Sequence, residues 1–110
     1  MKLPGIIYIG HRKIKIKEIS PKTADKDKIY GDFDSQQDLI RIDKSLKNEK
    51  KLNTLLHEIA HALLDHFNAE LNKKDEEKVC EVLGSGLSDV FFNNPKLIKV
   101  INDVYNTNKK

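Results

Sequence analysis

The spacing of apolar residues changes once along this chain of 110 residues, and that change constrains the fold more than any other feature. Between residues 6 and 43 apolar residues tend to alternate with polar ones, as in a strand with one buried face. From about residue 46 they recur at intervals of three and four, which is the spacing of an amphipathic helix. The pattern predicts an α+β chain, with a small sheet first and helices after it.

The first part of the chain is expected to form a small antiparallel β-sheet of two hairpins. Gly10 and His11 form the turn of the first hairpin, because glycine readily adopts the positive φ that such turns require. Residues 20–28 are polar and contain a proline, so we expect a loop there. The expected strands are residues 6–9, 12–19, 29–33 and 39–42.

The second part is expected to contain three helices. The first begins between residues 46 and 50 and ends near residue 67, the second runs to about residue 93, and the last follows Asn94 and Pro95. Gly84, Ser85 and Gly86 lower the helix propensity of the second helix, and we expect these small residues to permit close packing on the first. A chain of this length indicates one domain, residues 1–110, with the sheet at about 6–43 and the helices at about 46–106.

Residues 57–61 read His-Glu-Ile-Ala-His, an H-E-x-x-H motif inside the first of these helices. Residues four apart share one face of a helix, so His57 and His61 can present two imidazole nitrogens to one metal ion. Both lie at the border of the apolar stripe, whereas a solvated pair is more natural on the opposite face. Glu58 lies beside them, where its carboxylate can act on a nearby water without binding the metal. The motif predicts a zinc peptidase site, rather than a core helix with two surface histidines.

A zinc site needs at least one more protein ligand, and the next helix offers two glutamates on one face. The returning helix must reach the level of both imidazoles, which favours Glu81 over Glu77 as the third ligand. In that case Glu77 supports the metal ligands without binding the ion itself. The plainer alternative is that Glu77 and Glu81 are both ordinary solvated charges or helix-start residues. The remaining metal-binding residue types are weaker candidates: His11, His66 and Cys80.

The motif and the segment after it resemble the small phage-encoded members of the ImmA/IrrE-like metallopeptidases. Those members combine H-E-x-x-H with a helix of the form V-E-x-L-x-x-G-L, often followed by Asn-Pro. This chain has Cys-Glu-Val-Leu-Gly-Ser-Gly-Leu at residues 80–87 and Asn-Pro at residues 94–95, and residues 29–32 and 39–43 look like the family's strand pair. The resemblance implies a minimal zincin-like fold and a zinc-dependent peptidase whose third ligand is a glutamate on the second helix. By position that glutamate is Glu81.

The composition restricts the class of protein further. Charged residues make up 34% of the chain, and no apolar run approaches the length of a membrane span, so we expect no membrane partner. The single cysteine excludes an internal disulfide and fits a reducing cytoplasm, and we expect no secretory signal at the start. The basic run at residues 12–17 alternates with isoleucine, which indicates a solvated strand face and disfavours a nucleic-acid partner.

We therefore expect a cytoplasmic zinc peptidase that acts on a peptide or protein substrate. Zn²⁺ is held by His57, His61 and Glu81, and Glu58 is the general base of the hydrolysis. Residues 39–43 precede the motif helix, so this strand is the candidate edge for docking an extended peptide. Three residues remain as candidate hydrogen-bond donors to the oxyanion of the tetrahedral intermediate, with no choice among them: Tyr30, Tyr105 and His66.

Two functions from other classes remain as alternatives. The first is a phage or mobile-element regulatory protein that keeps the zinc site with little turnover, because a short chain leaves little room for a substrate cleft. The second is a nucleic-acid-binding protein in which the motif is coincidental. Peptide cleavage that depends on both metal and Glu58 distinguishes the peptidase from either alternative.

Overall fold

The computed structural model describes residues 1–108, so Lys109 and Lys110 of the expected domain lie outside the described residues. The described part has four strands and four helices, which confirms the α+β class. In chain order the elements are β1 (Ile6–Ile9), β2 (Arg12–Ile19), α1 (Pro21–Asp27), β3 (Gly31–Asp34), β4 (Leu39–Asp43), α2 (Asn48–His66), α3 (Lys73–Asn93) and α4 (Pro95–Asn108).

The sheet is mixed rather than purely antiparallel. β1 pairs with β2 and β3 pairs with β4, both in antiparallel register. The expectation of an all-antiparallel sheet is wrong where β2 and β4 join these pairs, because these two strands run parallel. Parallel neighbours need a long crossover, and residues 20–38 between β2 and β4 supply it. The strand order is β1-β2-β4-β3, so β4 is an interior strand and the expectation that it offers a free edge is wrong.

Residues 20–28 form the short helix α1 and its caps instead of the expected loop. The Ser20 side chain accepts a hydrogen bond from the backbone N–H three residues on, and Pro21 occupies the first helical position. Lys28 ends the helix in the left-handed conformation, with a φ of 57°. The sequence contains these capping signals, but α1 has only seven residues and one buried side chain, too few for a helical apolar pattern.

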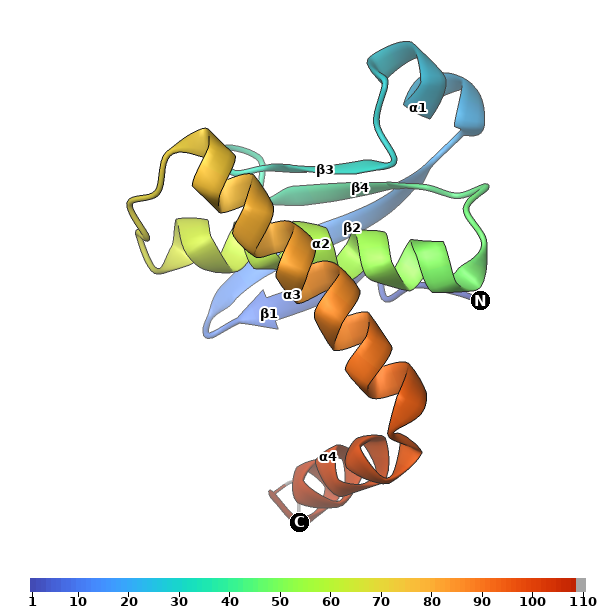
Figure 1. The fold of residues 1–110 in the computed structure, drawn as a ribbon, viewed down its shortest axis with the longest axis vertical. Coiled ribbons are helices and arrows are strands. Elements are labelled where there is room, and N and C mark those ends of the chain that lie inside the picture. Colours follow the sequence, from blue (N-terminus) through green and yellow to red (C-terminus); the bar gives the residue numbers. More distant parts are fainter. Residues whose placement is uncertain (109–110) are drawn as a thin grey trace.

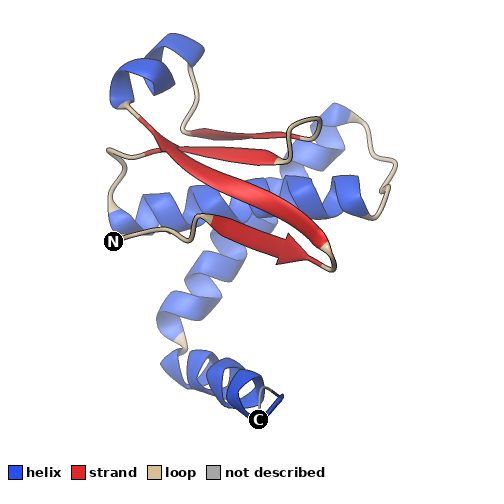
Figure 2. Cartoon of the chain, turned by 180° about the vertical axis from the view of Figure 1, so that it is seen from behind, coloured by secondary structure: helices blue, strands red, loops and turns tan. Residues whose placement is uncertain are grey.

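The sheet, α2 and α3 form successive layers, as Figure 1 shows. α2 packs on β3 and β4, and α3 packs on α2. Figure 2 shows the opposite face of the sheet, which the described helices leave uncovered. A hydrophobic core lies between the sheet and α2, with these buried residues: Leu3, Ile9, Ile14, Ile16, Ile40, Ile42, Leu55 and Ala62.

Two contacts fix α2 in its layer. The buried Lys51 places its Nζ 2.8 Å from Glu18 Oε1 of β2, which ties the start of α2 to the sheet. On the other side, a Cβ at Gly84 of α3 would lie 3.0 Å from His57 Cα, so the absence of a side chain allows α3 to approach α2 closely. The packing role expected for the small residues is confirmed at Gly84, but Gly86 faces open space.

Within residues 1–108 no helix is both long and apolar enough to cross a membrane.

Candidate metal centre and active site

The two histidines of the motif lie one turn apart on α2 and turn their rings to the same side. Each side chain is 18% exposed, and the ring centroids of His57 and His61 are 5.1 Å apart. The apolar face of α2 is buried against the sheet, so the rings emerge at its border, between β3 and the start of α3.

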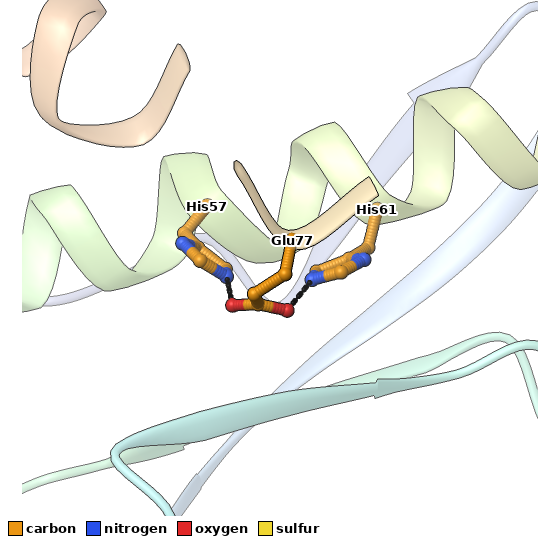
Figure 3. Close-up of side chains that lie close together, drawn as sticks. All are labelled: His57, His61 and Glu77. Atoms are coloured by element: carbon orange, nitrogen blue, oxygen red, sulfur yellow. Dashed lines mark hydrogen bonds and ion pairs between the residues drawn. The ribbon is translucent and has the colours of Figure 1, made fainter. Parts of the chain in front are cut away.

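Glu77 of α3 faces both imidazoles, as Figure 3 shows. Its Oε1 lies 2.8 Å from His57 Nε2, and its Oε2 lies 3.1 Å from His61 Nε2. One potential ligand atom from each of the three residues lies within 4.8 Å of the other two. Two imidazole nitrogens and one carboxylate oxygen are a donor set that zinc binds while keeping a fourth position open. The residues present therefore fit a zinc ion.

Glu81, which the sequence analysis favoured as the third ligand, is not part of this group. It is exposed and lies one turn after Glu77, where it lines a cavity next to His57. The physical reason is the path of the returning helix. Only residues 67–72 separate α2 from α3, and α3 crosses α2 (Figure 1). Along this path Glu77 comes to lie between the two rings, whereas Glu81, one turn further on, lines the cavity beside His57 instead.

Glu76, which the sequence pattern did not single out as a site residue, contacts the other ring nitrogen of His61. Its Oε2 lies 2.6 Å from His61 Nδ1. A carboxylate here accepts a hydrogen bond from a protonated Nδ1 and leaves Nε2 free to bind a metal. The available signal was the adjacent pair Glu76-Glu77 at the start of α3, where one carboxylate can serve each nitrogen of the same ring.

Glu58 is buried on the side of α2 that faces β3. Its side chain and those of His57 and His61 line one cavity with residues 31–33. The pKa of the Glu58 carboxyl is raised to about 7, chiefly by burial; the charge of His61 opposes this rise, and the charges of Asp32 and Glu77 add to it. A bound divalent cation lowers it, because positive charge favours the carboxylate. A carboxyl that titrates in this range is suited to take up and return a proton near neutral pH.

The free edge of β3 runs beside these residues. The Asp43 N–H donates to the Tyr30 carbonyl oxygen at 2.8 Å, so this pair is a hydrogen-bonded pair of the antiparallel ladder. Because bonded and non-bonded pairs alternate along the register of β3 and β4, Gly31 and Phe33 direct their backbone N–H and C=O groups away from β4. These groups are available to an added strand. A Cβ at Gly31 would lie 2.8 Å from Thr54 Cγ2, so only glycine lets β3 approach α2 this closely.

A cavity of about 480 Å³ adjoins the metal centre on the side of Tyr30. Besides Tyr30, it is lined by His57, Glu58, Glu77 and Glu81, together with residues of α2, α3 and the α1–β3 connection. Of the three candidate hydrogen-bond donors to the oxyanion, only Tyr30 lines this cavity, since His66 ends α2 and Tyr105 belongs to α4.

The other candidate metal ligands also lie outside the metal-binding group: His11 is exposed in the β1–β2 turn and Cys80 is fully buried. Burial raises the pKa of the Cys80 thiol to about 12, which keeps it protonated.

Residues 10–81, well over half of the chain, match the peptidase family model described as the IrrE N-terminal-like domain. The matched stretch contains both histidines of the motif, Glu58 and Glu77, and it ends at Glu81. Neither the curated proteins nor the solved structures gave a match to the chain.

Proposed function

The chain belongs to the IrrE N-terminal-like family of ImmA/IrrE-type peptidases, and from that premise we propose that it is a zinc-dependent peptidase. His57, His61 and Glu77 would hold the ion, and Glu58 is the general base. The supporting observation is that the Glu77 carboxylate faces both Nε2 atoms of the motif, with Glu58 buried beside them. Membership of a peptidase family and a three-residue donor set next to a carboxyl of raised pKa point to the same chemistry.

Each residue of the site has a separate task in this proposal. When bound, zinc supplies a Lewis acid that activates a water and polarises a peptide carbonyl. Glu58 accepts the proton of the attacking water and delivers it to the amine that leaves. Glu76 holds the ring of His61 in place through Nδ1, and the hydroxyl of Tyr30 is the candidate donor to the oxyanion.

The substrate would dock in extended form on the edge of β3, not on β4 as the sequence suggested. The outward backbone groups of Gly31 and Phe33 offer hydrogen bonds to an added strand, and the same strand lines the cavity at the metal centre. A peptide paired with this edge passes directly beside Glu58 and the two histidines.

The test is peptide hydrolysis by the zinc-loaded wild type and by the Glu58→Gln variant. The variant keeps the shape of the side chain and removes its basicity, so it should retain zinc and lose at least a hundredfold in kcat/KM. Unchanged hydrolysis in the variant would assign the activity to another site.

A regulatory protein with an intact zinc site is the second candidate, and the same experiment separates it from the peptidase. If the wild type binds one zinc per chain but cleaves no member of a broad peptide panel, the regulatory function replaces the enzymatic one. The shallow position of the centre favours this alternative, since the Glu77 side chain is 53% exposed.

A further inference from the structure

Two lysines line the cavity beside the metal centre without a carboxylate partner. Among the described residues, neither Lys28 nor Lys50 lies within 4.0 Å of an acidic side chain, whereas Lys51 and both arginines are paired. The Lys50 Nζ lies 4.7 Å from the centroid of the Tyr30 ring, a cation–π contact that holds the ammonium group at this end of the cavity. The backbone of Lys28 is fixed as the C-cap of α1.

The site is asymmetric along β3. On one side of the metal centre a cavity lined by Asp32 and Phe33 contains no lysine or arginine among its lining residues. On the other side the cavity of about 480 Å³ contains Lys28 and Lys50. Both cavities share Gly31, His57, Glu58 and Glu77, so a peptide laid along β3 passes from one to the other through the catalytic residues.

The lining of the cavity places the lysines within reach of a residue close to the scissile bond. The same cavity of about 480 Å³ is lined by both lysines and by His57, Glu58 and Glu77. Glu81 lines the same cavity and its charge opposes an anion there. It does not neutralise either lysine, because no ion pair joins it to Lys28 or Lys50.

We propose that Lys28 and Lys50 form a carboxylate-binding subsite that selects substrates with an acidic group close to the scissile bond. The inference rests on the proposed function for the position of the peptide, but not on turnover. Two sources supply a carboxylate: the side chain of a glutamate or aspartate, and the carboxyl terminus of the peptide. Lys50 binds the group as a positioned cation beside Tyr30, and Lys28 adds a second positive charge from the C-cap of α1.

The experiment measures binding to zinc-loaded Glu58→Gln protein, so that no substrate is consumed. The probes are acetylated and amidated peptides of eight residues in which one glutamate is moved along a neutral sequence, each matched by its glutamine counterpart. Dissociation constants come from amide chemical-shift titrations at low salt. A further series carries a free carboxyl terminus in place of the amide and identifies the source of the carboxylate.

We expect one glutamate position, or the free terminus, to bind about five- to tenfold more tightly than its neutral counterpart. In the same background Lys50→Gln and Lys28→Gln should each remove a part of this preference. Glu81→Gln should increase it two- to threefold, because it removes the opposing charge. Lys44→Gln is the matched control, since Lys44 is an exposed lysine outside the cavity lining.

Equal affinity for the acidic and neutral series, or no binding of any peptide in the millimolar range, would overturn the subsite. A preference that survives in Lys28→Gln and Lys50→Gln together would also overturn it. The outcome is separable from that of the proposed function. An acidic preference without hydrolysis by the wild type leaves the subsite standing and removes the enzyme, whereas hydrolysis without an acidic preference does the reverse.

Discussion

The helices α2 and α4 have the same kind of apolar spacing, but they differ in what covers it. α2 buries its apolar face against the sheet and carries both histidines of the candidate metal centre. Within its described residues α4 has no buried side chain; it packs mainly on the end of α3 and projects beyond the layers in Figure 1. Its apolar side chains are between 37% and 59% exposed: Leu97, Ile98, Val100, Ile101, Val104 and Tyr105.

The difference shows that an amphipathic pattern predicts a helix but not its packing partner. The sheet offers a continuous apolar face, so α2 can bury its stripe there and present its border residues in fixed positions. The stretch that matches the family model ends at Glu81, before the second half of α3 and α4. The packed part of the chain, from β1 to Gly84 of α3, therefore determines the position and chemistry of the candidate site.

The largest expected effect contrasts one isoleucine from each region. Ile40 of β4 is fully buried, so Ile40→Ala should lower the free energy of unfolding by about 2–5 kcal/mol through lost burial and the cavity left behind. Ile101 of α4 is 48% exposed, and Ile101→Ala should change it by less than about 0.5 kcal/mol. Urea unfolding of both variants measures the difference. Equal losses would mean that α4 is packed as firmly as the sheet.

The second prediction concerns the buried carboxyl of the packed region in metal-free protein. Burial raises the Glu58 pKa from 4.5 to about 7, so the folded state favours the protonated form. Its contribution to stability is fully present below pH 4.5 and is lost as the pH rises through about 7. Relative to Glu58→Gln, the metal-free wild type should lose roughly 3 kcal/mol over this window. A constant difference between the two proteins from pH 4 to 8 would refute the raised pKa.

The third prediction compares two glycines of α3 that lie two residues apart. Gly84→Val should destabilise the protein by about 1–3 kcal/mol and weaken zinc binding, because a Cβ there lies 3.0 Å from the backbone of His57. Gly86→Val is the control, since it faces open space and replaces glycine with a better helix former. Thermal unfolding and a zinc titration report both effects. Similar behaviour of the two variants would contradict the close approach of α3 to α2.

Much of the fold follows from local patterns in the sequence. Ile14 and Ile16 are buried while the lysines between and beside them are exposed, as the alternation in residues 12–17 predicted. The left-handed conformation of Gly10, with a φ of 59°, and the start of α4 at Pro95 also agree with the local signals. The parallel pairing of β2 with β4 was not readable, because it is set by long-range packing rather than by the residues of either strand.

The candidate site likewise has a part that the sequence predicts and a part that depends on long-range packing. The placing of His57, Glu58 and His61 together depends on the geometry of a single helix, so the motif alone predicts it. The choice between Glu77 and Glu81 depends on the crossing of α2 and α3, which a helical pattern does not contain. For the same reason the sequence does not reveal the contact of Glu76 with His61 or the position of Lys50 at the cavity beside the histidines.

The most direct test of the central claim is the zinc content of two variants that differ by one turn of α3. Glu77→Gln removes the carboxylate that faces both histidines, whereas Glu81→Gln removes the one that does not. Elemental analysis after dialysis against dilute zinc should find about one zinc per chain in the wild type and in Glu81→Gln, and a much lower content in Glu77→Gln. Loss of zinc in Glu81→Gln with retention in Glu77→Gln would contradict the assignment, and absence of zinc from the wild type would remove the metal centre altogether.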